Sequence, residues 1–442
     1  MSSDYRTRPA DASSAERLAD RGLRYDLVPA EDAEAFGGWL RASARGFHDS
    51  RPTQQSVDAQ RTGLAFERAI GVWDDASPEP LVPVATVASW PSRLTLPGET
   101  SVTGWAISDV TVAPTHRRKG VARALLEGEL RTAHEQGIPL AMLTVSEATI
   151  YGRYGFAPAA MAATWRIDTR RATWTGPTPG GQVRFLSLEQ LGEQRRELTE
   201  RARLRVPGEI EHWDFLWQRK LGAVDDGNKD QGKDLHAVRY DDEDGVTQGF
   251  ALYRFAEQES GFAAHVLELQ YLLAVTDDAY AALWRYLLEM DLVREVTAPL
   301  RSVDEPVAWQ VSDQRAARKS DEGDHLWVRI LDVAAALEAR RYRAPGRIAL
   351  RVSDALGFAA GDVLVDITED GTAKVSALDG EVPDGYAELA LSAADLGALY
   401  LGGVSAGTLV RAGRVTELRP GSADALDGSF RSPITPWLSI WF

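Results

Sequence analysis

The spacing of apolar residues predicts a first unit that mixes helices and strands. Apolar residues recur at helical spacing in residues 30–47, and residues 81–96 and 101–114 are rich in β-branched residues, as strands are. An amphipathic helix is predicted over residues 121–137, and a short apolar strand over 139–145 follows it. The order of helix, strands, helix and strand indicates an α/β unit.

A second segment repeats part of this order. Proline and glycine residues mark a linker over residues 169–182. Beyond the linker, helices are predicted over 188–203 and 278–291, with strands over 245–255 and 265–275 between them. The repetition indicates an internal duplication.

The third segment follows a different pattern. Asp332 caps a predicted helix over residues 332–342, and residues 346–354 and 361–369 alternate as strands do. A strand that runs into a helix is predicted over 387–403. The chain is therefore expected to be of the α/β (α+β) class. Its expected regions are a flexible N-terminus over residues 1–22 and three domains over 23–175, 176–329 and 330–442.

Composition and charge exclude several classes of function. The 442 residues hold 65 acidic and 49 basic side chains, for a formal net charge of −16. Such a chain is a poor non-specific ligand for nucleic acid, whereas a negative field speeds the approach of a cationic substrate. The chain has no cysteine, which excludes disulfides, thiolate catalysis and cysteine-bound zinc, and no spacing of histidine and carboxylate residues indicates a metal. The polar start and the lack of a long apolar run favour a cytoplasmic protein without a membrane span.

The most informative stretch is ISDVTVAPTHRRKGVARALLEGEL, residues 107–130. A β-branched strand enters a basic turn, and a helix opens directly behind the turn. Free backbone N–H groups and the helix dipole favour an anion there, and Gly120 and Ala122 leave room for phosphate oxygens. Candidate phosphate-binding residues of the turn are Arg117, Arg118, Lys119, Gly120, Val121, Ala122 and Arg123. The alternative interpretation is a solvated basic turn before an ordinary helix.

The turn resembles the coenzyme A-binding motif of the GNAT N-acetyltransferases, R/Q-x-x-G-x-G/A, which Arg117, Gly120 and Ala122 match. Together with SEATIYGRYGF, residues 146–156, and the three-segment plan, it makes the chain similar to the Eis (enhanced intracellular survival) family over nearly its whole length. The resemblance implies two GNAT domains, the second one degenerate, and a C-terminal domain of sterol-carrier-protein fold. It also implies an enzyme that uses acetyl-CoA and no metal, acetylates several amino groups of aminoglycoside antibiotics, confers resistance to them, and forms a homohexamer.

The same resemblance implies roles for individual residues. Tyr151 would donate a proton to the departing thiolate, and a free tyrosine, with a pKa near 10, is suited to act as an acid at neutral pH. The carboxylate of Phe442, at the end of the apolar sequence PWLSIWF, would act as the base. The aromatic residues around it are expected to anchor the last segment of the third domain against the first domain.

Further residues are assigned to coenzyme and acceptor by the resemblance. Val110, Thr111 and Val112 would lie along the acetyl-pantetheine arm, and Ser146 and Glu147 would help to hold the coenzyme. Phe47 and Asp49 would line the acceptor pocket, although Asp49 can equally be an ordinary helix-end aspartate. Trp441 stands where the family often has an acidic residue, which removes one negative charge from the expected pocket.

The second segment, two histidines and two alternative functions also enter the prediction. In the second segment, Asp277 and Asp278 replace the basic turn and would repel a pyrophosphate, so no coenzyme is expected there. His48 and His116 have no spaced partner and are interpreted as structural or surface residues. Acylation of protein lysines, and a non-catalytic role in lipid binding or assembly through the third domain, stay open beside acetylation of small polycationic amines.

Overall fold

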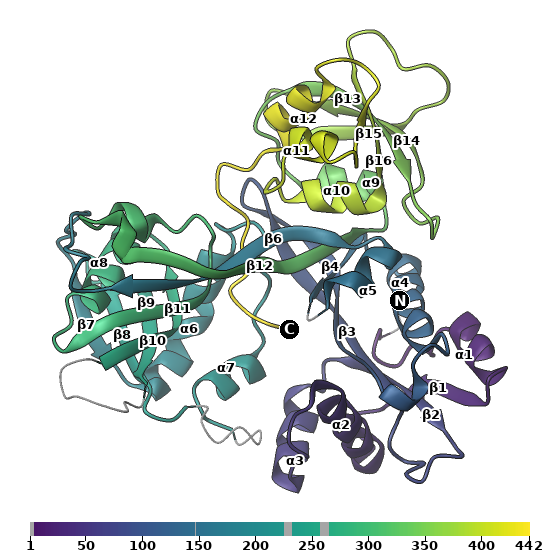
Figure 1. Ribbon diagram of the computed structural model, residues 1–442, viewed down its shortest axis with the longest axis horizontal. Helices are drawn as coiled ribbons and strands as arrows, with labels where there is room; N and C mark the ends of the chain where they lie inside the picture. The colour runs from purple at the N-terminus through teal and green to yellow at the C-terminus, as the bar shows by residue number, and fades with distance from the viewer. Residues whose placement is uncertain (1–3, 146, 225–231, 257–264) are drawn as a thin grey trace.

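The computed structural model describes residues 4–145, 147–224, 232–256 and 265–442. Two α/β units lie side by side, and a third unit lies above their junction (Figure 1). Within the described residues one sheet runs through both lower units in the order β1-β2-β3-β4-β5-β12-β6-β11-β10-β9-β8-β7. Its strands are β1 (Leu23–Leu27), β2 (Arg68–Asp74), β3 (Ala85–Leu96), β4 (Thr100–Val112), β5 (Leu140–Thr144), β6 (Ala157–Asp168), β7 (Gln182–Leu186), β8 (His236–Asp241), β9 (Thr247–Phe255), β10 (His265–Ala274), β11 (Val293–Arg301) and β12 (Ala317–Ile330).

Strand β12 ties the two lower units together. It comes from the second segment of the chain, yet it lies between β5 and β6 of the first unit and pairs antiparallel with both. On the other side of β5, the parallel pairing with β4 is limited to Trp105–Ala141 and Ala106–Met142. Beyond that point β4 and β5 separate, which leaves a gap between their carboxyl ends.

Helices cover both faces of the first unit. They are α1 (Ala12–Ala19), α2 (Ala33–Phe47), α3 (Gln54–Gly63), α4 (Val121–Glu135) and α5 (Ala148–Tyr151). The expected flexible N-terminus is wrong for the part that forms α1. The Ser14 hydroxyl donates to the Ala124 carbonyl, Arg131 pairs with Asp11, and Leu18 is buried, so these contacts hold α1 on α4. Eight residues of amphipathic helix gain their order from this packing rather than from helix propensity.

The second unit repeats the arrangement of the first. Its helices are α6 (Leu188–Arg203), α7 (Asp214–Lys220) and α8 (Asp277–Leu288). Strands β10 and β11 run parallel and are paired only up to Glu268 and Thr297, so they too separate at their carboxyl ends. The predicted internal duplication therefore has a structural counterpart in two parallel strand pairs that diverge.

The third unit has a separate sheet in the order β15-β14-β13-β16-β17 within the described residues. Its elements are α9 (Val333–Ala339), β13 (Gly346–Ser353), β14 (Gly361–Ile367), β15 (Ala373–Ala377), β16 (Ala387–Ser392), α10 (Ala393–Tyr400), α11 (Ala406–Arg411), β17 (Thr416–Glu417) and α12 (Ser422–Phe430). Arg329 of β12 is fully buried, and its Nη2 donates to both carboxylate oxygens of Asp354, at 2.7 and 2.8 Å. This ion pair fixes the third unit on the sheet below.

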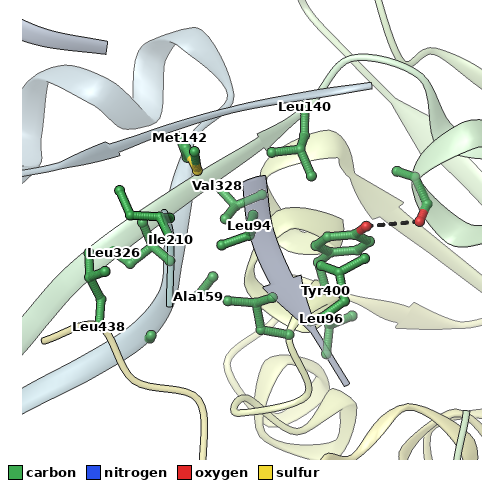
Figure 2. Packing of buried hydrophobic residues seen from close by; sticks show 14 of the residues in the cluster. Leu94, Leu96, Leu140, Met142, Ala159, Ile210, Leu326, Val328, Tyr400 and Leu438 are labelled. Carbon is green, nitrogen blue, oxygen red and sulfur yellow. Dashed lines mark hydrogen bonds between the residues drawn. The ribbon is translucent and has the colours of Figure 1, made fainter. Parts of the chain in front are cut away.

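One apolar core fills the junction of the three units (Figure 2). Leu94 and Met142 come from the first unit, Ile210 comes from the second, and Tyr400 and Leu438 come from the third. The Tyr400 hydroxyl donates to the Ala336 carbonyl at 2.9 Å, so this buried polar group is satisfied. After α12 the chain leaves the third unit and descends between the two lower units, where it ends (Figure 1).

Candidate active site

A cavity of about 860 Å³ lies where the chain's last residues meet the first two units. Helix α2 and strand β4 of the first unit contribute to its wall, and α7 of the second unit contributes Leu216 and Arg219. Trp441 and Phe442 close it from the third unit. All three units are therefore required to form one cavity.

Phe442 is held inside this cavity by two side chains. The Thr144 hydroxyl, at the end of β5, donates to an oxygen of Phe442 at 2.6 Å. The Phe442 ring packs edge-on against Trp90 of β3, with centroids 5.9 Å apart. The last residue therefore has a fixed position at the separated end of β4 and β5.

The residues before Phe442 are also anchored by side chains from both lower units. His325 Nε2 lies 2.8 Å from the Ile440 carbonyl, and burial lowers the pKa of this histidine, so it is neutral and donates that hydrogen bond. The His325 ring also packs edge-on against Trp441, which is 53% exposed. The Ser439 amide donates to the Glu209 carboxylate at 3.0 Å. These contacts fix the path of the chain toward the cavity.

Tyr151 lines the same cavity. It ends the short helix α5, is buried, and packs edge-on against Phe156. Burial, assisted by the nearby Glu147, raises the pKa of Tyr151 to about 12. Its hydroxyl therefore keeps its proton at neutral pH. None of the described residues forms a hydrogen bond with this hydroxyl, although Tyr151 and Phe442 line the same cavity.

The predicted acceptor residues lie at the end of helix α2 and just beyond it. Phe47 is its last residue and is exposed, and Asp49 follows two residues later; both line the cavity. The helix lies very close to β4, because a Cβ at Gly46 would lie only 2.4 Å from the Thr111 Cβ. His48 ends the helix in the left-handed conformation, and His116 is buried against Asp74, 2.9 Å away.

Sequence reasoning missed two further carboxylates that line the cavity. Asp109 lies in β4 at a bulge, where the pairing with β3 shifts and its φ is +51°. Its carboxylate accepts a hydrogen bond from the Ser43 hydroxyl of α2. Glu67 directly precedes β2. Burial, together with the neighbouring Asp109 charge, raises the pKa of Glu67 well above its ordinary value, and burial also raises the pKa of Asp109.

The basic turn before α4 has the geometry of an anion site. Arg118 and Gly120 both have positive φ, +63° and +75°, and no side chain caps the first turn of α4. Backbone N–H groups at this helix start therefore remain available to a ligand. Arg117, Arg118 and Lys119 are exposed, and Arg21, which sequence reasoning missed, donates to the Lys119 carbonyl. The uncapped helix start and the surrounding cations fit the pyrophosphate of coenzyme A.

The other predicted coenzyme residues surround this turn or the gap beside it. Val110 and Val112 are half-buried in β4, whereas Thr111 is buried and its hydroxyl contacts the Thr86 hydroxyl at 2.6 Å. Val121 is buried under the turn, Ala122 is half-buried, and Arg123 pairs with Glu127 one turn along α4. Glu147 is exposed just before α5, and Ser146 lies outside the described residues.

The start of α8 in the second unit corresponds to the start of α4, but it is acidic rather than basic. Asp277 and Asp278 begin α8 and are exposed, where the first unit has cations. The gap between β10 and β11 contains Arg301, whose guanidinium donates to the Leu272 carbonyl at 2.9 Å and pairs with Glu305. The ring of Trp437, in the segment after α12, covers this guanidinium, and the Arg301 Cζ lies 4.6 Å from the ring centre. Arg301 and Trp437 therefore narrow the gap, and a cavity of about 350 Å³ that they line remains beside them.

Each of the three units matches a known protein family. Residues 29–159 and 208–330 each match a family described as acetyltransferase (GNAT) domain. Residues 333–439 match the sterol carrier protein domain. The predicted fold class, two GNAT domains followed by a sterol-carrier-protein-like α+β domain, is confirmed.

Related proteins are similar over almost the whole chain. An uncharacterized N-acetyltransferase of Streptomyces avermitilis is 34% identical over 424 residues, covering 94% of this chain and 98% of that protein. The N-acetyltransferase Eis of Mycobacterium tuberculosis is 34% identical over 391 residues, covering 86% of this chain and 90% of that protein. The crystal structure of Eis1 from Mycobacterium abscessus superposes with a TM-score of 0.77 at 28% identity, covering 95% of this chain and 99% of that chain.

The two GNAT domains and these relatives define the chain as a GNAT N-acetyltransferase. Within that class, the chain belongs to the Eis family. The prediction of an acyltransferase of this family is thus confirmed. Among the described residues, none of the helices combines the length and the apolar character that crossing a membrane requires.

Proposed function

We propose that the protein transfers the acetyl group of acetyl-CoA to primary amines of polycationic acceptors such as aminoglycosides, at more than one position. The observation that carries the proposal is the cavity in which Tyr151 and Phe442 meet a carboxylate-rich wall. Its lining includes the carboxylates of Asp49, Glu67, Asp109 and Phe442, against the guanidinium groups of Arg51 and Arg219. This excess of negative charge favours an acceptor with several ammonium groups.

Acetyl-CoA, when bound, supplies the acetyl thioester. In the proposed arrangement, backbone N–H groups at the start of α4 and the cations Arg117, Arg118 and Lys119 hold its pyrophosphate. Residues 110–112 line the gap between β4 and β5 and would orient the arm that carries the thioester. The second unit would bind no coenzyme, because Asp277 and Asp278 stand at the start of α8 in place of the cations of the first unit and would repel a pyrophosphate.

The proposed proton transfers use two residues of this chain. The carboxylate of Phe442 accepts a proton from the acceptor ammonium group, which leaves a neutral amine that can attack the carbonyl carbon. The carbon–nitrogen bond forms and the carbon–sulfur bond breaks. Tyr151, which keeps its proton at neutral pH, protonates the departing sulfur and recovers a proton from the acetylated nitrogen. The products are an amide and a thiol, with one proton released to water.

Turnover of amines tests the proposal directly. Purified protein is incubated with acetyl-CoA and a panel of aminoglycosides, and thiol release is measured together with the mass of each product. The expected result is saturable turnover and products that carry more than one acetyl group. Binding of acetyl-CoA without turnover of any amine in the panel would refute the proposal. An intact-mass measurement of the same protein verifies that Phe442 is its last residue.

Three further parts of the proposal have separate tests. Titration calorimetry should give one acetyl-CoA per chain, and a value of two would contradict the assignment of the second unit. The family resemblance extends the proposal to a cytoplasmic homohexamer, which light scattering and cell fractionation test. Antibiotic resistance follows only if expression in a susceptible host raises the inhibitory concentration of an aminoglycoside that the purified enzyme acetylates. Protein lysine acylation is the alternative if peptides, and not small amines, are turned over.

A further inference from the structure

One side of the cavity carries two carboxyl groups, those of Asp109 and Glu67. Both side chains are half-buried and line the cavity. No described residue donates a hydrogen bond to the Glu67 carboxylate, and that of Asp109 receives one from Ser43. Besides burial, the charge of Asp109 raises the pKa of Glu67, so the two carboxylates repel each other, and a cation bound beside them would relieve this repulsion.

The backbone shows that the position of Asp109 is specific. The bulge in β4 places Asp109 and Val110 opposite the single residue Val87 of β3, and Asp109 adopts a left-handed conformation that most side chains avoid. The Thr86 hydroxyl donates to the Asp109 carbonyl at 2.7 Å, and Ser43 of α2 holds its carboxylate. The bulge thus aims a carboxylate into the cavity immediately before the part of β4 that is proposed to orient the thioester.

The available cations do not neutralise this part of the cavity. Arg219 of α7 lowers the pKa of both Asp109 and Glu67, and Asp49 raises that of Asp109, so these groups interact electrostatically across the cavity. Arg219 also has interactions of its own, and the lining that it shares with Arg51 includes the carboxylates of Asp49, Glu67 and Asp109. A ligand with an additional positive charge would therefore be attracted to this wall. Because N-acetyltransferases bind amines, an ammonium group is the natural candidate.

We propose that Asp109 and Glu67 form a second-ammonium subsite, which binds an unreacted amino group of the acceptor while another amino group is acetylated. This inference rests on the proposed function, because it presumes that amines are the acceptors. The subsite selects acceptors with two or more amines over monoamines of the same length. It also orients the acceptor, because one ammonium group is held beside β4 while the reacting amine approaches Tyr151 and Phe442.

A pair of matched amines tests the subsite. The kcat/KM values for 1,5-diaminopentane and pentylamine are measured at saturating acetyl-CoA for the native protein, Asp109→Asn and Glu67→Gln. Asparagine tolerates the left-handed conformation at position 109, and both changes preserve shape while they remove charge. Each variant should lose about tenfold in kcat/KM for the diamine, mainly through KM, since a charge-assisted contact is lost. Its kcat/KM for pentylamine should change by less than about threefold.

Asp58→Asn is the matched control. Asp58 lies on α3 close to this region, is exposed, and does not line the cavity, so the variant has the same change in net charge. Its kinetic values should equal those of the native protein. Calorimetric titration of the diamine into the coenzyme A-saturated protein gives a second readout that does not depend on turnover. The two carboxylate variants should show about tenfold weaker diamine binding there.

The outcomes separate the two proposals. Turnover of amines with an unchanged diamine preference in both variants would overturn the subsite and leave the proposed function intact. Equal losses for diamine and monoamine would also overturn it, because the two carboxylates would then act on the reacting amine or on the fold. Absence of turnover of every amine by the native protein would refute the proposed function itself.

Discussion

The hydrogen bond between Thr144 and Phe442 gives the sharpest test of the proposed base. Thr144→Val removes one hydroxyl group and keeps a β-branched side chain of nearly the same shape, which suits its place in β5 opposite Leu326 of β12. The 2.6 Å bond to the Phe442 oxygen, and the longer 3.4 Å bond that the hydroxyl accepts from the Phe442 amide, are therefore lost with little change to the sheet. The edge-on packing of Phe442 against Trp90 remains, so the residue should stay near the cavity with a less defined position.

The expected loss follows from the strength of that bond. A hydrogen bond to a charged group contributes about 1.5–3 kcal/mol, and the half-buried position of Thr144 favours the lower end of this range. About 1.5 kcal/mol corresponds to roughly a tenfold change in an equilibrium or a rate. Thr144→Val should therefore lower kcat about tenfold, whereas the affinity for acetyl-CoA should stay within about twofold of the native value.

The assay compares three proteins at saturating acetyl-CoA and acceptor. Thr144→Ser keeps the hydroxyl and should retain most of the native kcat, which separates the loss of the bond from the loss of the methyl group. Thermal unfolding shows whether the variants are folded. Unchanged kcat in Thr144→Val, or an equal loss in the serine and valine variants, would refute the role given to this contact and weaken the assignment of Phe442 as the base.

Three other predictions concern the acid, the domain junction and the carboxylate wall. Tyr151→Phe should lower kcat by about 100-fold or more, and because the pKa of Tyr151 is raised to about 12, this residue should cause no alkaline loss of kcat below about pH 11 in a pH–rate profile. Asp354→Ala leaves the buried Arg329 guanidinium without its partner and should destabilise the protein by about 3–5 kcal/mol in denaturant titration; a smaller effect than about 1 kcal/mol would contradict this account. Glu67→Gln should raise the melting temperature at pH 8 and have little effect at pH 4. A carboxyl group with a raised pKa in the folded state loses its stabilising contribution as the pH rises through that pKa, whereas glutamine does not titrate. A difference in melting temperature between the two proteins that does not change with pH would contradict this reasoning.

Local sequence was sufficient for the parts of the site that are continuous in the chain. The basic turn at Arg117 and Gly120 combines strand, glycine and helix within a few residues, and Tyr151 lies in a short segment whose pattern resembles a known family. The fold class was also predictable, because helical and strand periodicity repeat along the chain. These features depend on neighbours in sequence, and a single sequence displays them.

The carboxylate wall depends on contacts that a single sequence does not display. Asp109 looks like an ordinary residue in a strand, and only the bulge in β4 directs it into the cavity. Glu67 and Arg219 are far apart in the chain and come together through tertiary packing, while Arg21 reaches the basic turn from the end of α1. The N-terminal helix was missed for a related reason, since its order comes from the contact with α4.

The position of β12 has a consequence for synthesis on the ribosome. Strand β5 ends at residue 144, yet the strand that pairs with its free edge ends at residue 330, so translation must add more than 180 residues before that edge is covered. Until then the nascent catalytic unit exposes backbone groups that can pair with another chain. Ribosome-bound chains shorter than residue 330 should therefore depend on chaperones, and the first unit should not fold into an active enzyme when it is expressed alone.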